Sequence, residues 1–311
     1  MGHPLPSFHG FVGQRDIARS LQAHCQGAVA KGNPLPHIRL DGPSGSGKTR
    51  LAKAVAKEMG TSCLEVYASR QIRKLQLVET LASVKTGDIV FIDEIHALPT
   101  DCQELLYPAI DRQEVPEIDA EKRCAVEGKW KKVPQFTLVV ATDQPGRLQK
   151  ALRQRMVLRF TLSEYTEAEL RQIVFNYAAE RNMLLKPQAA TRLALAARGI
   201  PRRARHLLES LRTVMTDLGM EVTKVLVVRH LKSLGVDADN LTPTDRRYLS
   251  ILHNGGGRMS LASLALQLGL DAGTVYQETE TYLQRKGLIA IGSGGRHLTD
   301  AGKRLAAERG L

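Results

Sequence analysis

Residues 41–49 read DGPSGSGKT, and this stretch decides the class of fold. From Gly42 to Thr49 it matches the pattern G-x-x-x-x-G-K-[ST], directly after an apolar segment and before the helical pattern RLAKAVAKEMG. Glycines let the backbone curl until its N–H groups point at phosphate oxygens, and the N-terminus of the next helix adds partial positive charge. The stretch therefore predicts a P-loop that holds a nucleotide between a strand and a helix.

The residues of this loop have separate predicted tasks at a site for ATP and Mg²⁺. Lys48 reaches the terminal phosphates, and the hydroxyl of Thr49 is a ligand of the magnesium ion. The predicted nucleotide-binding residues of this segment are Gly42, Gly45, Gly47, Lys48, Thr49 and Arg50.

The segment DIVFIDEIHALP, residues 88–99, supplies the second half of the site. It reads as an apolar strand that ends in two acids, so that Asp93 holds the magnesium shell and Glu94 polarises the attacking water. Two carboxylates at a strand end could also form a solvated turn. The P-loop upstream favours the catalytic interpretation.

A further strand, FTLVVATD at residues 136–143, delivers Thr142 at its end. The threonine hydroxyl can sense the γ-phosphate beside the two acids, or it can cap the following helix. The next segment, LRQRMVLRF at residues 152–160, carries three arginines. In a parallel sheet this segment lies at the edge of the domain, so its arginines could serve a neighbouring subunit. Arg159 is in phase with the strand and has the simpler interpretation of a solvated edge residue.

Short apolar runs alternate with helical patterns over residues 1–162, which is typical of a parallel sheet with crossover helices. The expected strands are HIRLDG, CLEVYA, DIVFIDE, FTLVVATD and MVLRFTL. The first part of the chain therefore belongs to the α/β class.

Residues 163–237 lose the strand signal and follow a helical period instead. Within SEYTEAELRQIVFNYAAE the apolar residues recur at i, i+3, i+4 and i+7, and Ser163 is the expected N-cap. These apolar residues are Leu170, Ile173, Val174 and Tyr177. The segment predicts a small helical domain.

The composition turns polar around GVDADN, residues 235–240, and residues 238–311 form a third unit. The segments TPTDRRYLSILHN, SLASLALQL and DAGTVYQETETYLQRKG predict three helices, and LIAIGSGGRHLTDAG predicts a glycine-rich ribbon. This order describes a winged helix, a domain that contacts DNA or serves as a protein-docking module.

The composition fits a soluble protein with a polyanionic partner, although an ordinary basic protein has the same balance. The 311 residues include 44 Lys and Arg against 32 Asp and Glu, a net charge of +12. Cys25, Cys63, Cys102 and Cys124 form no CxxC pair, so we expect reduced packing thiols and no metal cluster. No segment approaches the ~18 apolar residues of a membrane span and no signal peptide is evident, so we expect a cytoplasmic protein.

Together these motifs resemble the RuvB family of AAA+ ATPases, the motors of Holliday junction branch migration in bacteria. The matching segments are FVGQ, GPSGSGKT, DIVFIDEIHALP, ELLYPAI, PQFTLVVAT, LRQRM, RGIPRRARHLL and DRRYLSILHNGGG. The resemblance covers essentially the whole chain. It implies an AAA+ P-loop parallel-sheet domain at residues 1–162, a small helical lid at 163–237 and a C-terminal winged-helix DNA-binding domain at 238–311.

The resemblance also implies a catalytic group supplied by a neighbouring subunit. Arg155, in the second arginine position of LRxR, resembles the arginine finger that enters the adjacent protomer's site, with Arg153 as the fallback choice. Such a finger is electrostatic catalysis in trans, worth about 10³ to 10⁵ in rate in the GTPase precedent. The implied assembly is a hexameric ring.

Further nucleotide contacts follow from the resemblance. Arg202, after GIP, resembles the sensor-2 arginine that reads the γ-phosphate from the lid. Tyr165 matches a lid tyrosine near the nucleotide, and Phe11 with Val12 lies where the family encloses adenine.

The third helix of the predicted winged helix is poorly suited to binding in the major groove of DNA. Its third helix carries Glu278 and Glu280 against Arg285 and Lys286, a nearly neutral set that suits a phosphate-lined groove poorly. Arg296 on the glycine-rich wing is the better DNA-binding residue, because a cation on a thin ribbon can enter a minor groove. The wing is also the DNA element of the family, but its usual RGR is GGR here.

The sequence differs from the family pattern at two other places, the hairpin that docks a partner and the end of the sensor strand, FTLVVATD. In the family a hairpin apolar enough to dock RuvA stands at residues 117–132, whereas here the hairpin is charged and Trp130 is its only large aromatic residue. The family's ATTRAG has become ATDQPG, and its Arg-Pro near adenine is absent. These changes indicate a diverged member whose loading partner differs from an ordinary RuvA.

Three functions fit these residues. The first is an ATP-driven motor that encircles duplex DNA and moves a branch point in recombination and repair. The second is an ATP-switched loader or assembly platform, similar to clamp loaders, without processive translocation. The third is a DNA-binding regulator that uses ATP only to oligomerise. The catalytic set of Lys48, Asp93, Glu94 and Arg155 argues against the third, because a module that only binds ATP has no need for Glu94.

Overall fold

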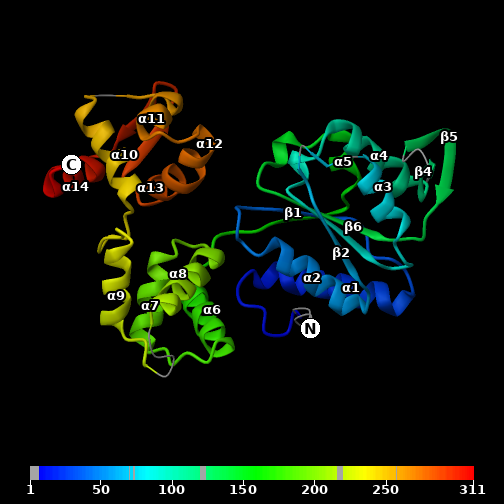
Figure 1. Ribbon diagram of the computed structural model, residues 1–311, viewed down its shortest axis with the longest axis horizontal. Helices are drawn as coiled ribbons and strands as arrows, with labels where there is room; N and C mark the ends of the chain where they lie inside the picture. Colours follow the sequence, from blue (N-terminus) through cyan, green and yellow to red (C-terminus); the bar gives the residue numbers. More distant parts are fainter. Residues whose placement is uncertain (1–6, 70, 73, 120–123, 216–219, 257) are drawn as a thin grey trace. The chain divides into compact units, whose positions relative to one another are not determined.

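The computed structural model describes residues 7–69, 71–72, 74–119, 124–215, 220–256 and 258–311 (Figure 1). The chain divides into two compact units. The first comprises Met1–Ile173 with Gly199–Arg203, and the second comprises Val174–Arg198 with Ala204–Leu311. The finer division into three domains at residues 162 and 237 remains a prediction.

A five-stranded parallel sheet forms the centre of the first unit. Its order is β2 (Cys63–Tyr67), β3 (Ile89–Asp93), β6 (Thr137–Thr142), β1 (Ile38–Asp41) and β7 (Leu158–Thr161). Each of the five expected strands is present. β7 lies at one edge, as predicted for the segment with the three arginines.

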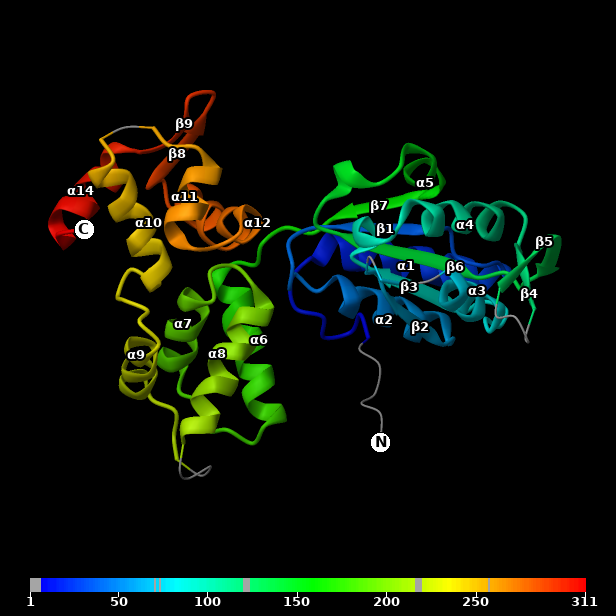
Figure 2. The same ribbon diagram turned by 45° about the horizontal axis from the view of Figure 1, so that its top comes forward.

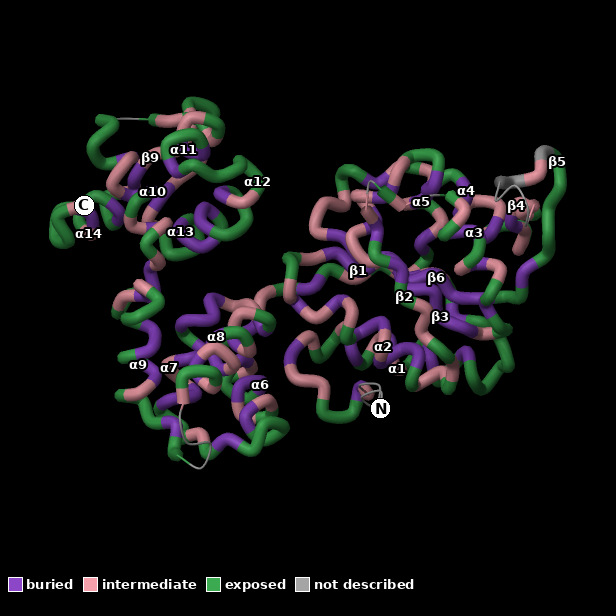
Figure 3. The backbone as a smooth tube through the Cα atoms, in the orientation of Figure 1, coloured by how far each residue is buried: buried purple, intermediate pink, exposed green. Residues whose placement is uncertain are grey.

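The strand residues alternate between two apolar cores, one on each face of the sheet. Ile89 and Phe91 face α1 (Arg15–Lys31) and α2 (Lys48–Met59). Val90 and Ile92 face α3 (Lys74–Ala82) and α4 (Thr100–Asp111). Both faces are covered (Figure 1), so β3 and β6 are buried over nearly their whole length (Figure 3) and read as continuous apolar runs.

Two smaller elements complete this unit. The antiparallel hairpin of β4 (Glu114–Asp119) and β5 (Cys124–Lys132) follows α4, and α5 (Lys150–Arg155) precedes β7. Trp130 on β5 is 46% exposed, and the Arg112 guanidinium lies 5.4 Å from the centre of its indole ring. The hairpin is therefore charged and aromatic where it is described; residues 120–123 lie outside the described part.

The helical segment contains α6 (Glu167–Glu180), α7 (Pro187–Ala196), α8 (Pro201–Val214) and α9 (Lys224–Ser233). Leu170, Ile173 and Val174 are buried on α6, as the helical period predicts. The expectation that Ser163 caps this helix is wrong. Thr166 accepts from the Glu169 N–H at 3.3 Å, and the Glu169 carboxylate accepts from the Thr166 N–H at 2.8 Å, so a capping box three residues later begins the helix.

The C-terminal segment has the helices and ribbon of a winged helix. The helices are α10 (Pro243–Asn254), α11 (Leu261–Leu268), and a continuous helix made of α12 (Ala272–Thr274), a π-helical stretch (Val275–Glu280) and α13 (Thr281–Arg285). β8 (Ile289–Gly292) and β9 (Gly295–Leu298) form the ribbon (Figure 2). The last helix, α14 (Asp300–Arg309), was not among the predicted elements.

A buried ion pair attaches the ribbon to the third helix. Arg296 donates to both carboxylate oxygens of Glu280, at 2.9 and 3.1 Å, and the Tyr248 hydroxyl donates to the same carboxylate at 2.8 Å. The Glu280 side chain is fully buried and that of Arg296 is 17% exposed. Glu280 therefore does not contribute to the exposed charge of the helix, and Arg296 has a structural role in the wing. Its DNA contact stays a prediction.

The described cysteines agree with a packing role. Cys25 and Cys102 are buried and Cys63 is half-buried, all three with free thiols. Burial raises the pKa of Cys25 to about 12 and that of Cys63 to about 11, which keeps both thiols protonated and unreactive. Over the described residues, none of the helices combines the length and apolar character needed to cross a membrane.

Replacing Arg296 by Met should destabilise the winged helix by about 3 kcal/mol, because the substitution leaves the buried Glu280 carboxylate without its cation. Urea unfolding followed by circular dichroism measures this loss. Arg258→Met is the matched control, since Arg258 is exposed. Equal stability of the two variants would show that the Arg296 pair contributes nothing.

Candidate nucleotide site

The P-loop connects β1 to α2, and its backbone conformation requires glycine. Gly42, Gly45 and Gly47 have φ of 146°, 77° and 105°, in the region where a side chain is strained. Space is also limiting. A Cβ at Gly42 would lie 3.0 Å from the Leu162 carbonyl oxygen, and one at Gly45 would lie 2.7 Å from Cβ of Arg202.

Lys48 and Thr49 begin α2 at the mouth of this loop. The buried Lys48 ammonium donates to the carbonyl oxygens of Gly42 at 2.7 Å and of Pro43 at 3.1 Å, and burial lowers its pKa. The Thr49 hydroxyl lies 3.3 Å from the Asp93 carboxylate. Two oxygen ligands this close fit a magnesium ion that keeps several waters, so the predicted pair suits the cation.

The end of β3 places Glu94 beside the end of β6. Glu94 adopts φ 51°, a conformation rare for a residue with a side chain and typical of functional sites. Burial, and after it the negative charge of Asp143, raises the pKa of the Glu94 carboxyl, while Lys48 lowers it. A raised pKa makes the carboxylate a stronger proton acceptor, which suits a group that polarises water.

Thr142 does not cap a helix. Its hydroxyl accepts the Gln144 N–H at 2.9 Å and lies 3.0 Å from Nδ1 of His96, and the residue is fully buried. The same His96 nitrogen lies 3.3 Å from Glu94 and 3.6 Å from Asp143. The His96 imidazole thus lies between the Thr142 hydroxyl and the carboxylates of Glu94 and Asp143.

His96 and Asp143 are site residues that the motif analysis missed. Burial lowers the pKa of His96, so its imidazole is neutral at pH 7. The ligand atoms of Glu94, His96 and Asp143 lie within 4.8 Å of one another. Each residue stands within two positions of a predicted one, at the same end of adjacent strands, and that proximity is the signal that could have found them.

Phe11 and Tyr165 lie against the third glycine of the loop. The Tyr165 hydroxyl would be 3.1 Å, and the Phe11 ring 3.8 Å, from a Cβ at Gly47. The guanidinium of Arg50 is 5.9 Å from the Phe11 ring. Val12, next to Phe11, is half-buried. Phe11, Tyr165 and Arg50 thus lie on or beside the loop, whereas a contact of Val12 with the nucleotide stays a prediction.

Arg202 also reaches the P-loop. Its guanidinium donates to the Ser44 hydroxyl at 3.0 Å, and its Cβ packs on Gly45. The residue is exposed and its positive charge acts on both Lys48 and Glu94. The sensor role that the resemblance implies for Arg202 stays a prediction.

Arg155 lies at the C-terminus of α5, apart from these groups. It donates to Asp111 with bonds of 2.5 to 3.0 Å, and its guanidinium lies 4.6 Å from the centre of the Tyr107 ring. The side chain remains 28% exposed. Arg159 donates to the carbonyl oxygens of Met156 and Arg153 at 3.0 Å each, so it closes the end of the helix rather than being only solvated.

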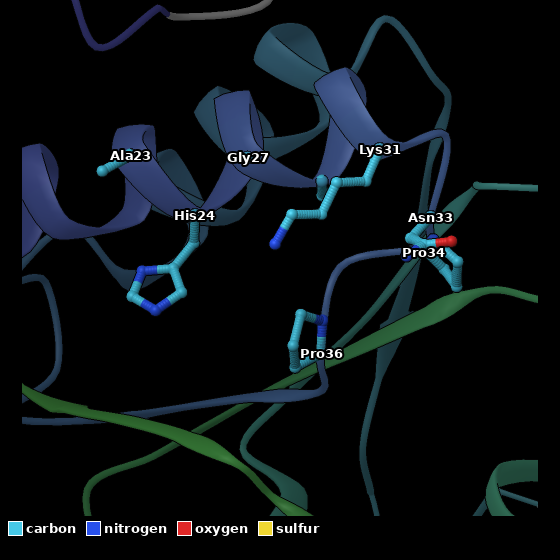
Figure 4. A pocket seen from close by; sticks show the side chains of 8 residues that line it. Ala23, His24, Gly27, Lys31, Asn33, Pro34 and Pro36 are labelled. Carbon is cyan, nitrogen blue, oxygen red and sulfur yellow. The ribbon is translucent and has the colours of Figure 1, made fainter.

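A separate open pocket of about 410 Å³ lies beside α1 (Figure 4). The side chains of His24 and Lys31 project from the helix toward Pro36. None of its lining residues belongs to the nucleotide set, so we do not include it in the site.

Comparison with known proteins agrees with this architecture. The family profile described as "Holliday junction DNA helicase RuvB P-loop domain" matches residues 5–162, and that of the "RuvB C-terminal winged helix domain" matches residues 239–306. The chain belongs to the RuvB family. The predicted AAA+ P-loop domain with a helical segment and a winged helix is confirmed.

Individual relatives cover nearly the whole chain. The Holliday junction branch migration complex subunit RuvB of Synechococcus sp. (strain CC9605) is 35% identical over 96% of this chain and 87% of its own. That of Fervidobacterium nodosum is 33% identical over 93% and 84%. The solved Thermotoga maritima RuvB Holliday junction branch migration motor superimposes with a TM-score of 0.84 at 30% identity over 98% of both chains.

Gly45→Ala should weaken ATP binding by at least about tenfold, because the new methyl group forces Arg202 away from the loop. Gly60→Ala is the matched control: Gly60 has a similar φ of 69°, but nothing lies within 4 Å of its Cβ position. The control should lose about 1 kcal/mol of stability and keep its affinity. Fluorescent ATP-analogue titration measures both. If the two variants bind ATP with equal affinity, the close approach of Arg202 to Gly45 does not matter for ATP binding.

Proposed function

We propose that this chain is the ATPase subunit of a DNA-translocating motor that moves a Holliday junction branch point in recombination and repair. The observation that carries the proposal is that one family likeness spans the whole chain while the hydrolytic groups converge at one end of the sheet. Hydrolysis and DNA binding therefore reside in one polypeptide. The three-domain division and the cytoplasmic location belong to the same proposal.

The side chains divide the hydrolytic work. Lys48 and the loop N–H groups hold the phosphates, and Thr49 with Asp93 would hold Mg²⁺, which neutralises phosphate charge when bound. Glu94 orients a water and accepts its proton. The neutral His96 and the buried Thr142 keep the Glu94 carboxylate in place, and Arg202 carries the nucleotide state into the helical segment.

Arg155 completes the site of a neighbouring subunit in this proposal. Its pair with Asp111 lies at the end of α5 and is only partly shielded from solvent, and surface ion pairs stabilise a protein by at most about 1 kcal/mol. The guanidinium can therefore leave Asp111 for a phosphate of the next subunit at little cost. The resulting assembly is a homo-oligomeric ring, proposed as a hexamer.

The winged helix and the hairpin provide the macromolecular contacts. In this proposal the wing contacts the phosphate backbone of DNA. The Arg258 guanidinium lies against Gly294 of the wing and adds exposed positive charge there. Arg296 supports the same ribbon from within and is the second candidate for DNA contact. The lysines beside Trp130 favour an acidic docking partner over an apolar one, so the loading partner differs from an ordinary RuvA.

A four-way junction and duplex DNA should each raise the ATPase rate, and the stimulation should fall as salt rises because phosphate contacts release counterions. Steady-state ATPase assays at low and high salt measure this. A branch-migration assay distinguishes a motor from a loader, because only a motor yields processive product. Absence of stimulation at low salt would overturn the proposed function.

Mixing two inactive variants tests the finger of the neighbouring subunit. Glu94→Gln should bind ATP without turnover, and Arg155→Ala should do the same. An equal mixture should recover activity at about one quarter of its interfaces, since head-to-tail contacts pair an intact Glu94 with an intact Arg155. Glu94→Gln mixed with Lys48→Ala is the control. Both of these defects lie in the same site, so recovery there, or none in the first mixture, contradicts the trans role.

A further inference from the structure

Arg198 is buried in an ion pair that joins the helical segment to the winged helix. Its guanidinium donates to both carboxylate oxygens of Asp245, and the two side chains are 3% and 1% exposed. Arg198 follows α7, whereas Asp245 lies in the first turn of α10. Two segments of the second compact unit are therefore held by a charge pair from which water is excluded.

Other bonds to the same guanidinium make this contact rigid. Nε of Arg198 donates to the Asn240 carbonyl oxygen at 3.1 Å, and its guanidinium carbon lies 3.8 Å from the centre of the Tyr282 ring on α13. In return, Arg285 donates to the Arg198 carbonyl oxygen at 2.9 Å. Both the side chain and the backbone of Arg198 are thus fixed by the winged helix.

A second arginine, Arg192 on α7, reinforces the attachment. Arg192 donates to the Asn240 side chain and, at 3.0 Å, to the Asp237 carbonyl oxygen. Residues 237–242 are therefore tied to the helical segment at several points. A connection of this kind resists bending, because each bond is buried or half-buried and has a fixed direction.

The residues directly after Arg198 belong to the nucleotide site. The Gly199 carbonyl oxygen accepts the Tyr165 N–H at 3.0 Å, Ile200 packs on Gly45, and Arg202 donates to Ser44. Arg198 and Gly199 both have positive φ, 55° and 83°, so the chain turns sharply here. Only three residues, 199–201, separate Arg198 of the buried pair from Arg202, which contacts the P-loop.

We propose that Arg198 is the positioning residue that couples the nucleotide site to the winged helix. A displacement of Arg202 when the nucleotide changes is passed through residues 199–201 to Arg198 and from there to α10 and α13, because nothing in the Arg198 network is free to absorb it. The assignment rests on the proposed function. Arg198 itself contacts no nucleotide and takes no part in hydrolysis.

The first test uses hydrogen exchange and needs no DNA. Backbone amides of Leu241, Thr242 and Asp245 are bonded to acidic side chains or to the Thr242 hydroxyl at the attachment. Adding a non-hydrolysable ATP analogue with Mg²⁺ to the full-length protein should change their exchange rates. Arg198→Lys should abolish this change, since lysine keeps the charge beside Asp245 but cannot make the forked contact.

The second test measures turnover. Arg198→Lys should keep the basal kcat and the KM for ATP while losing the stimulation by junction DNA. Arg181→Lys is the matched control, because Arg181 forms an exposed ion pair with Glu209 in the same helical segment. A further variant inserts two glycines between Arg198 and Gly199. This insertion leaves the residues of the Arg198 network and those of the P-loop contact unchanged and interrupts only the chain between them. It should also keep the basal turnover and lose the stimulation by junction DNA.

The outcomes separate the coupling from the proposed function. Normal nucleotide-dependent exchange and normal DNA stimulation in Arg198→Lys would overturn the coupling. If Arg198→Lys does not fold, the insertion variant decides: full stimulation overturns the coupling, and lost stimulation with intact basal turnover supports it. If the ATP analogue changes hydrogen exchange at Leu241, Thr242 and Asp245 in the wild-type protein but DNA does not stimulate its ATPase, the coupling stands and the motor function is refuted.

Discussion

The parallel register between β1 and β6 is the constraint on which the nucleotide site depends. Asp41 pairs with Thr142, and the Gly42 N–H donates to the Thr142 carbonyl oxygen at 3.0 Å, so the P-loop starts where the sensor strand ends. β3 pairs with the other side of β6 and ends in Asp93. A slip of one residue would turn Thr142 away from His96 and separate the two halves of the site.

This convergence brings negative charge into a partly buried space. Burial, and after it the negative charge of Asp143, raises the pKa of Glu94, and the Lys48 ammonium offsets this only in part because it is desolvated as well. The strained backbone at Glu94 adds to the cost. Added positive charge beside Glu94 would relieve this imbalance, which is consistent with the proposed binding of ATP together with a cation. The neutral His96 can orient Glu94 without taking its proton.

Sequence reasoning succeeded where a pattern is local and failed where partners come from distant segments. The strands, the P-loop and the Asp93–Glu94 pair are encoded in short runs, so each was predictable. His96 and Asp143 gain their meaning only when β3 and β6 lie side by side. Arg296 was predicted as a free cation because its partner Glu280 looked like a surface acid, and only the packing of the third helix shows that this acid is buried.

Buried arginines of this chain stabilise the fold, whereas exposed arginines are free to exchange their hydrogen-bond partners. Arg198 is enclosed and has every part of its guanidinium engaged, so moving it would leave a charged Asp245 buried, at a cost of about 3 to 5 kcal/mol. Arg202, four residues later, is exposed and donates to the Ser44 hydroxyl at 3.0 Å, a contact that a phosphate can replace. In the proposed cycle the sensor residue changes partners, whereas the residue that transmits its movement does not. The short segment from 198 to 202 contains one buried and one exposed arginine, as these two proposed roles require.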